Sequence, residues 1–296
     1  MRCLVTGDKG FVGRHLVRLL KSQGHDVFGF DLKCGEDLRN YEDVRKAIDD
    51  CRPDKIFHLA AIAYVPESFL DPRRAIETNT IGSLNILEAV RNLGLKTKIH
   101  LCGSSEEYGD IEGDYTDEQT LPNPLSPYSI GKIGMDYFGQ LYAQSYGMSV
   151  VITRTFNHTG PGRGEMYAES AWAKQIVEIE QGRRTVLRHG DLKPERNYTD
   201  VRDIVRAYTI AIDLPNGVYN ICSDQNVTMQ EVLDILKKKA KCPIYTMQDS
   251  NLMRPADFSF KAPSSKKFRE QTGWEHTILL DQTLGDLLEY WRKRPA

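Results

Sequence analysis

The sequence predicts an α/β protein built on a Rossmann-type doubly wound parallel sheet, with a smaller α/β lobe in the C-terminal part. Short apolar runs bounded by turns alternate with longer amphipathic stretches up to about residue 160, which is typical of strand–helix–strand units. The first run leads into a turn with regularly spaced glycines, and the alternation is lost after about residue 160. We therefore expect one domain over residues 1–160 and a second lobe over 161–296, with parts of 197–222 returning to the first domain.

The individual elements follow from the spacing of apolar residues and from the turn signals between them. Strands are expected at Arg2–Thr6, Asp26–Asp31, Lys55–Ala60, Lys98–Cys102 and Val150–Thr155. Helices are expected at Phe11–Ser22, Tyr41–Asp50, Arg73–Leu93, Pro127–Tyr146 and Ala168–Gln181, and later at Val201–Asp213, Thr228–Ala240 and Leu280–Lys293.

The turn after the first strand carries three glycines at three-residue spacing. Gly7 permits a tight turn, Gly10 lets the backbone approach a phosphate, and Gly13 lets the next helix pack close to the sheet. Phe11 and Val12 begin that helix, where free N–H groups and the positive end of the dipole favour an anion. The pattern therefore predicts a pyrophosphate-binding turn.

An acidic residue ends the second expected strand. Asp31 follows Gly7 by 24 residues, a distance at which a carboxylate accepts hydrogen bonds from the ribose hydroxyls of an adenine dinucleotide. Because a carboxylate repels a 2′-phosphate, we expect NAD(H) as the preferred cofactor, with NADP(H) as the alternative.

A tyrosine and a lysine at helical spacing are the candidate proton-transfer groups. Tyr128 is the only one of 14 tyrosines with lysine at the fourth following position, Lys132. Positions i and i+4 share a helix face, so we expect the ammonium group to favour the phenolate and lower the tyrosine pKa. Ser104, at the end of an expected strand, would hydrogen-bond the same oxygen. The group suits proton transfer with a sugar hydroxyl during hydride transfer.

These motifs together resemble the extended short-chain dehydrogenase/reductase family, whose members act on nucleotide-linked sugars. The resemblance rests on the glycine turn, on residues 58–61 (His-Leu-Ala-Ala), on Asn79 with Gly82, on the Ser-Ser-x-x-Tyr-Gly strand end and on Tyr-x-x-x-Lys. It covers essentially the whole chain. It implies that Ser104, Tyr128 and Lys132 are the catalytic residues.

The resemblance also implies further contacts to the cofactor. Asp37 and Leu38 would flank the adenine, while Leu59, Ala60, Ala61 and Asn79 would line the cofactor together with Tyr128, Lys132 and His158. The residues alone leave two alternatives open. The run 59–61 fits a buried strand end equally well, and the asparagine fits a residue that joins a helix to a loop. His58, at the end of a buried strand, is interpreted as structural.

The second half carries blocks that resemble the nucleotide diphosphate site of this family. Arg196 and Arg254 would each contact phosphate oxygens, Asn157 would donate to the diphosphate, and Asp257 would accept from a ribose hydroxyl. Ser105, Arg163 and Lys174 complete the expected substrate site. The alternative for these arginines is a surface salt bridge.

The blocks are most similar to the GDP-mannose branch, which contains 4,6-dehydratases and the reductases that consume their product. We expect reduction of GDP-4-keto-6-deoxy-D-mannose to GDP-rhamnose, because the short chain, the blocks at 156–162 and 202–205, and Asp31 match the reductases. Glu106 points to the alternative, since it stands where dehydratases keep the base that removes the C5 proton. Another nucleotide-sugar epimerase or reductase stays open. A non-catalytic nucleotide sensor is disfavoured by the intact Ser104, Tyr128 and Lys132.

Composition limits the partners and the location of this chain of 296 residues. Its formal charge of −2 gives no electrostatic footprint for nucleic acid or a membrane surface, and no apolar run approaches the length of a membrane span. Its six cysteines are scattered, so we expect no disulfide framework, no metal site and a cytoplasmic protein. The family resemblance implies a homodimer through the helices near 73–93 and 127–146.

Overall fold

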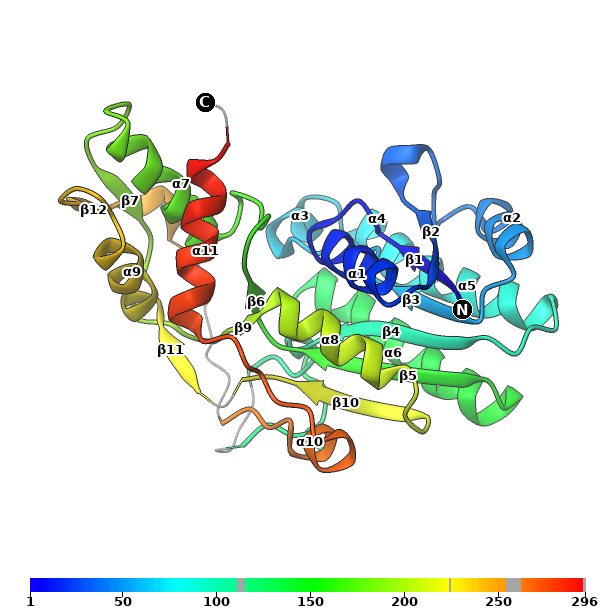
Figure 1. Ribbon diagram of the computed structural model, residues 1–296. Coiled ribbons are helices and arrows are strands. Elements are labelled where there is room, and N and C mark those ends of the chain that lie inside the picture. Colours follow the sequence, from blue (N-terminus) through cyan, green and yellow to red (C-terminus); the bar gives the residue numbers. More distant parts are fainter. Residues whose placement is uncertain (111–114, 224, 254–261, 295–296) are drawn as a thin grey trace.

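A six-stranded parallel sheet forms the larger part of the molecule (Figure 1). The computed structural model describes residues 1–110, 115–223, 225–253 and 262–294. The strand order is β10-β5-β4-β3-β1-β2, and each neighbouring pair runs parallel. The strands are β1 (Arg2–Thr6), β2 (Asp26–Phe30), β3 (Lys55–His58), β4 (Lys98–Ser104), β5 (Ser149–Thr155) and β10 (Gly217–Ile221). The predicted doubly wound α/β architecture is therefore confirmed.

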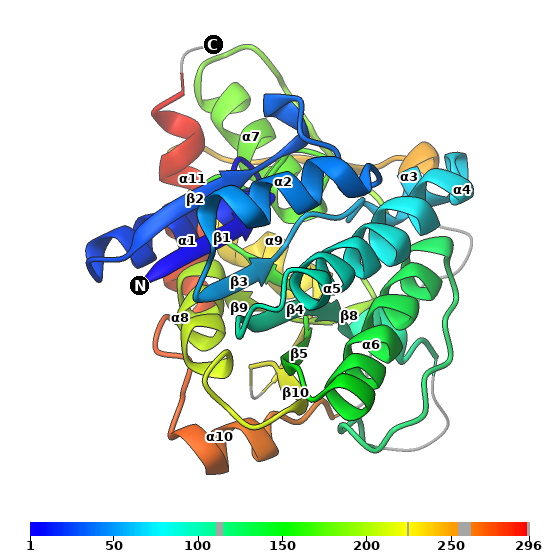
Figure 2. The same cartoon turned by 90° about the vertical axis from the view of Figure 1, so that its right-hand side faces the viewer.

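Helices cover both faces of this sheet, as Figure 2 shows. One face carries α2 (Tyr41–Cys51), α5 (Gly82–Asn92) and α6 (Pro127–Tyr146), and the other carries α1 (Phe11–Ser22), α8 (Val201–Ala211) and α10 (Lys266–Thr272). Alternate strand residues supply the two cores: Leu4 packs into the first, whereas Cys3 and Val5 pack into the second. Because helices cover both faces of the sheet, both alternating sets of strand residues are apolar, and the strands are therefore nearly continuous apolar runs in the sequence.

Several elements differ from the sequence prediction; for example, the strand expected over Lys55–Ala60 ends at His58. The helix expected over 73–93 consists of α4 (Pro72–Ile76), a π-helical turn η2 (Glu77–Ile81) and α5. The strand expected to end at Cys102 continues to Ser104, because β5 extends its pairing to that residue. The sheet also takes its sixth strand, β10, from the C-terminal half, where Val218 pairs with Ile152 of β5.

The smaller lobe consists of three helices and short strand pairs. Helices α7 (Ala168–Glu180), α9 (Met229–Lys238) and α11 (Leu280–Arg292) enclose a core that includes Trp172, Leu233 and Leu287. The short pairs are β7 (Leu187–His189) with β12 (Thr246–Gln248), β8 (Glu195–Asn197) with β11 (Asn226–Thr228), and β6 (His158–Thr159) with β9 (Thr199–Asp200). The other short helices are η1 (Leu32–Cys34), α3 (Val65–Leu70), η3 (Ser105–Glu107) and η4 (Ser250–Leu252).

The order of the strands in the sheet indicates where a ligand would bind. The chain leaves β1 for β2 on one side and returns to β3 on the other, so the strand order reverses beside β1. Ligands of such sheets bind beyond the carboxyl ends of the strands at this reversal. Thr6, His58, Ser104 and Thr155 end four of the parallel strands and thus lie along one edge.

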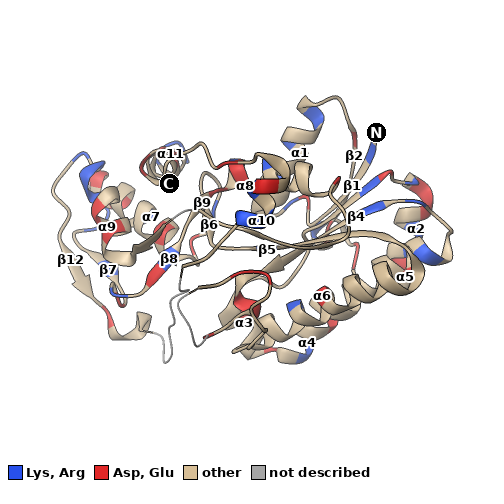
Figure 3. Cartoon of the chain, turned by 90° about the horizontal axis from the view of Figure 1, so that it is seen from below, with Lys and Arg blue, Asp and Glu red and all other residues tan. Residues whose placement is uncertain are grey.

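Charged side chains of both signs are interspersed over the two parts of the molecule (Figure 3). Within the described ranges, no helix combines the length and the apolar character that a membrane span requires.

Candidate active site

The glycine turn between β1 and α1 has the geometry that a pyrophosphate requires. Gly7 adopts a left-handed φ of 72° and donates its N–H to the Phe30 carbonyl at 2.7 Å. A Cβ on Gly13 would overlap the Gly7 carbonyl oxygen and lie 2.8 Å from the Asp8 Cα, so only glycine lets α1 approach this closely. Because Gly10 caps α1 with no side-chain hydrogen bond, the first helical N–H groups stay free for an anion. The turn therefore fits a dinucleotide.

Asp31 lies at the carboxyl end of β2 and is held in place by backbone groups. Its carboxylate accepts from the N–H of Lys9 at 3.0 Å and from that of Lys33 at 2.9 Å. The Glu36 carboxylate accepts from the N–H of Asp31 at 2.9 Å and brings a second negative charge to this end. Sequence analysis missed Glu36, which lies in a loop without periodicity. Each Asp31 oxygen keeps a further lone pair for a ribose hydroxyl.

The loop after β3 lines the glycine turn directly. The N–H groups of Leu59 and Ala60 donate to the Thr6 hydroxyl at 3.1 and 3.2 Å, and Ala61 follows in a half-buried position. A Cβ on Gly7 would lie 2.9 Å from the Ala60 nitrogen. The run follows the end of β3 at His58 and packs against the glycine turn.

Asn79 joins the π-helical turn to this same loop. Its Oδ1 accepts from the Ile62 N–H at 2.8 Å, and its Nδ2 donates to the Ile62 carbonyl at 3.1 Å. Both polar atoms of the side chain are thus used to shape the wall of the site.

Asp37 and Leu38 lie farther along the loop after β2. Asp37 pairs with Arg39 at 2.5 Å, and this hydrogen bond lowers the pKa of the carboxyl group. Leu38 is buried, and a Cβ added to Gly82 of α5 would lie 2.8 Å from the Cβ of Leu38. The leucine therefore also has a packing role.

The catalytic candidates meet between β4 and α6. Ser104 ends β4, and its side chain interacts with the Tyr128 hydroxyl in the sense that lowers the tyrosine pKa. Lys132 donates from Nζ to the Cys102 carbonyl oxygen at 2.6 Å. α6 begins at Pro127 with a capping box from Ser126, which orients its first two turns toward the strand end. The predicted grouping of serine, tyrosine and lysine is present, and all three side chains are buried.

The electrostatics of this group differ from the sequence expectation. Burial raises the pKa of Tyr128, and the interaction with Ser104 only partly opposes it. Burial also lowers the pKa of Lys132, whose ammonium group is directed to the Cys102 carbonyl. The expected lowering of the tyrosine pKa is therefore wrong for this structure, because desolvation outweighs the helix neighbour.

Burial lowers the pKa of His58 and of His158, two of the buried imidazoles near the site. Burial lowers the pKa of His58 to about 3, and its nitrogens bond Thr6 at 2.7 Å and Ser83 at 2.8 Å. Its predicted structural role agrees with these contacts. Burial lowers the pKa of His158 to about 4, and its ring stacks on Phe11 at 6.2 Å with planes 6° apart. His158 therefore touches the first residue of α1.

Glu106 lies on η3 next to the catalytic candidates. Its N–H donates to the Ser104 hydroxyl at 3.2 Å, and its negative charge raises the pKa of Tyr128. Ser105 is buried behind it. Glu107, which sequence analysis did not select, is also fully buried. Its only sequence signal is a second carboxylate directly after a buried strand.

The predicted substrate residues fall into two groups. Asn157 and Arg163 lie near the glycine turn. The Asn157 Oδ1 is buried without a hydrogen-bond partner, while the Arg163 guanidinium lies 3.3 Å from the Tyr167 ring centre and 5.2 Å from that of Phe11. A buried, unpartnered amide oxygen is typical of a ligand site.

The second group belongs to the smaller lobe. Arg196 on β8 donates to the Glu195 carbonyl at 2.7 Å. Lys174 on α7 forms an ion pair with Glu165 and lies 5.7 Å from a ring of Trp291, so it already has partners. Arg254 and Asp257 lie outside the described residues.

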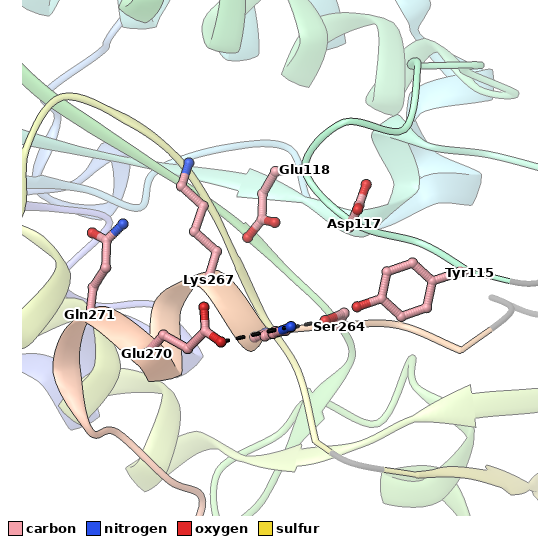
Figure 4. A pocket seen from close by; sticks show the side chains of 8 residues that line it. Tyr115, Asp117, Glu118, Ser264, Lys267, Glu270 and Gln271 are labelled. Atoms are coloured by element: carbon pink, nitrogen blue, oxygen red, sulfur yellow. Dashed lines mark hydrogen bonds and ion pairs between the residues drawn. The ribbon is translucent and has the colours of Figure 1, made fainter.

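A pocket of about 210 Å³ lies elsewhere, between α10 and the loop at 115–118 (Figure 4). Carboxylates and lysines share its walls, and Lys266 pairs with Glu270 at 3.8 Å along α10. Its lining residues are Tyr115, Asp117, Glu118, Ser264, Lys266, Lys267, Glu270 and Gln271. None of the catalytic candidates lines it, so we place the active site at the sheet edge. No group of three His, Cys, Asp or Glu side chains in the described part of the chain could hold a metal ion.

Comparison with known proteins places the chain in a family. A family model described as GDP-mannose 4,6 dehydratase matches residues 33–287. GDP-6-deoxy-D-mannose reductase of Pseudomonas aeruginosa is 30% identical over 99% of this chain and 98% of the relative. A structure of RMD from the same organism, complexed with NADPH, superposes with a TM-score of 0.91 at 30% identity, over 99% of both chains.

A UDP-glucose 4-epimerase of Thermus thermophilus in complex with NAD gives a TM-score of 0.88 at 29% identity, over 99% of both chains. The conserved architecture and the full-length matches agree with the glycine turn and the buried serine, tyrosine and lysine described above. The chain therefore belongs to the GDP-mannose 4,6-dehydratase family, within the nucleotide-sugar branch of the extended short-chain dehydrogenases/reductases.

Proposed function

We propose that this enzyme uses a nicotinamide dinucleotide to reduce the 4-keto group of GDP-4-keto-6-deoxy-D-mannose, giving GDP-rhamnose. The observation that carries the proposal is the buried contact between Ser104 and Tyr128, at the same sheet edge as the glycine turn. Full-length similarity to a GDP-6-deoxy-D-mannose reductase supports the choice of sugar nucleotide and reaction.

The residues of the chain supply the proton and the orientation of the keto group. A bound nicotinamide cofactor supplies the hydride. Tyr128 donates its hydroxyl proton to the alkoxide that forms at C4, while Ser104 hydrogen-bonds the same oxygen. The raised pKa of Tyr128 suits this direction, because the phenol stays protonated until the alkoxide appears. Lys132, on the next turn of α6, would add positive charge near the reacting oxygen.

The substrate diphosphate would lie between the sheet edge and the smaller lobe. Asn157 would donate from its amide NH₂ group to a phosphate oxygen, and the Arg163 guanidinium, which lies over the Tyr167 ring and 3.6 Å from Glu169, would add positive charge. Arg196, Arg254 and Asp257 complete the proposed set on the grounds of their sequence blocks.

The second candidate, 4,6-dehydration of GDP-mannose, rests on Glu106. If the enzyme is a reductase, Glu106→Gln keeps most activity, because no C–H bond at C5 is broken and only a side-chain hydrogen bond changes, worth about 1 kcal/mol. The measurement is NADH-dependent loss of the keto-sugar, together with incubation of the wild type and GDP-mannose in deuterated water. Deuterium at C5 of a product made from GDP-mannose would establish the dehydratase instead.

Cofactor preference is expected to depend on Asp31. Asp31→Ser removes the charge but keeps an oxygen that can cap η1, as serine commonly does. The ratio of kcat/KM for NADPH over NADH should rise about tenfold or more, equal to about 1.4 kcal/mol. Asp26→Ser, at the exposed opposite end of β2, is the matched control and should leave the ratio unchanged. A wild type that already prefers NADPH tenfold contradicts this role of Asp31.

We also propose a homodimer through α6 and the π-helical turn. Ile130, Tyr137 and Leu141 are about half exposed and recur on one face of α6, while Ile81 on η2 is 41% exposed. Leu141→Glu should convert the dimer to a monomer in analytical ultracentrifugation, because the interface would bury an unpaired charge. Leu279→Glu on the smaller lobe, where the leucine is 70% exposed, is the control. A wild-type monomer at micromolar concentration contradicts the proposal.

A further inference from the structure

Glu107 is a buried carboxyl group beside the catalytic candidates that the mechanism above does not use. Its side chain is fully buried, and its Oε1 accepts from the Ser104 N–H at 2.7 Å. The Ser104 hydroxyl in turn accepts from the Glu106 N–H at 3.2 Å. These bonds form a capping box around η3, so the backbone positions of Ser104 and Glu106 both depend on this carboxyl group.

The second oxygen of Glu107 connects the strand end to helix α6. Its Oε2 lies 3.1 Å from the Arg154 Nε of β5, which also donates to the Asp136 Oδ2 at 2.9 Å. Asp136 follows Lys132 by four residues and Tyr128 by eight, so the three share a face of α6. One chain of contacts thus runs from the serine to the helix that carries the tyrosine.

The charges of this cluster require a shared proton. A single guanidinium faces two carboxyl groups, and no side chain of the three is more than 5% exposed. Arg154 neutralises only one of the two carboxylates, and Lys132, the other cation near Glu107, is directed to the Cys102 carbonyl; a proton held between Glu107 and Asp136 relieves the repulsion between them. Burial and the charge of Asp136 raise the pKa of Glu107 to about 8, in agreement with this arrangement.

The backbone is also shaped to receive the carboxyl group. A Cβ on Gly103 would lie 2.7 Å from the Glu107 Oε1, so glycine at that position leaves the space free. On another side, the Tyr108 ring centre lies 4.9 Å from the Arg154 guanidinium and packs against the cluster.

We propose that Glu107 is a positioning residue, which fixes Ser104 relative to Tyr128 by joining the end of β4 to α6 through Arg154 and Asp136. The catalytic consequence rests on the function proposed above, whereas the position of Ser104 does not.

The test compares two substitutions of similar size. Glu107→Gln keeps an oxygen that accepts from the Ser104 N–H, while its NH₂ group loses the bond from the Arg154 Nε and can donate to Asp136 instead. Glu107→Leu has neither group, and it leaves the ion pair of Arg154 and Asp136 balanced. In ¹⁵N-labelled protein we expect the Ser104 amide proton to shift upfield in the leucine variant and to stay near its wild-type position in the glutamine variant.

The kinetic expectation follows the same order. Glu107→Leu should lower kcat for keto-sugar reduction about tenfold or more, with KM changed less than about twofold, because the substrate contacts remain. Glu107→Gln should stay within about threefold of the wild type. Glu180→Gln in the smaller lobe is the matched control, since this carboxyl group, with 8% of its side chain exposed, accepts from the Lys241 N–H and pairs with Arg292. It should lower the melting temperature and leave kcat unchanged.

Several outcomes would overturn the proposal. A folded Glu107→Leu variant with wild-type kcat would do so. If that variant does not fold, the glutamine variant provides the test. The ratio of its kcat to that of the wild type should rise between pH 7 and 9.5, because the wild type loses the shared proton in this range and an amide cannot. A ratio that does not change with pH contradicts the proposal. The groups that face Glu107 are the same in both proteins: Cys102, Tyr108, Lys132, Asp136 and Arg154.

Failure of the proposed function is distinguishable from failure of this inference. If the wild type reduces no nucleotide sugar, the function is wrong, yet the amide resonance still reports on Ser104. An unmoved Ser104 resonance in a folded Glu107→Leu variant shows that Glu107 does not hold the serine.

Discussion

Replacing Tyr128 by phenylalanine is expected to lower kcat about 100-fold or more, which corresponds to about 2.7 kcal/mol of transition-state stabilisation. The ring still fills its buried position, so folding and cofactor binding should persist, but the proton for the C4 alkoxide is lost. Single-turnover measurements with NADH and the keto-sugar would separate the chemical step from binding.

Tyr137→Phe on the same helix is the matched control, because that side chain is 55% exposed. Its turnover should equal that of the wild type. Near-normal turnover in Tyr128→Phe, with an unchanged melting temperature, would exclude Tyr128 as the proton donor.

Gly13→Ala is expected to weaken NADH binding about 100-fold or more, since the added Cβ would overlap the Gly7 carbonyl and lie 2.8 Å from the Asp8 Cα. The turn and α1 must separate to accept it, which moves the N–H groups away from the pyrophosphate. Fluorescence titration with NADH measures the effect, and thermal unfolding measures the accompanying loss of stability.

Gly285→Ala on α11 is the control for a glycine inside a helix. A Cβ there would lie 3.5 Å from Lys239, an ordinary contact, and alanine favours the helix by about 1 kcal/mol. That variant should bind NADH normally and unfold at the same or a higher temperature. Wild-type affinity in Gly13→Ala would contradict the assignment of this turn to the pyrophosphate.

The sequence was sufficient to predict those parts of the site that depend on local pattern. The glycine turn follows from steric limits on the backbone, and the position of Tyr128 and Lys132 on one face of α6 follows from helical periodicity. Ser104 was found because it follows an apolar run. Each of these features is specified by residues close in sequence.

Features that depend on distant contacts could not be predicted in this way. The role of Glu107 depends on its contact with Arg154 of β5, which also binds Asp136 of α6. No local sequence pattern indicates that these three residues lie together. The direction of the Tyr128 pKa shift depends on how completely the fold desolvates the hydroxyl. Lys174 was expected at the substrate, yet Glu165 competes for its charge.

The sixth strand has a consequence for the way the chain reaches its native state. Because β10 comes from residues 217–221 and pairs with β5, the sheet stays unfinished until most of the chain has left the ribosome. Until then β5 presents an open hydrogen-bonding edge, and the surface that α8 later covers beside α1 exposes apolar side chains such as Leu16 and Val151. A fragment ending near residue 160 would therefore aggregate rather than fold, and native assembly should be slow and largely post-translational.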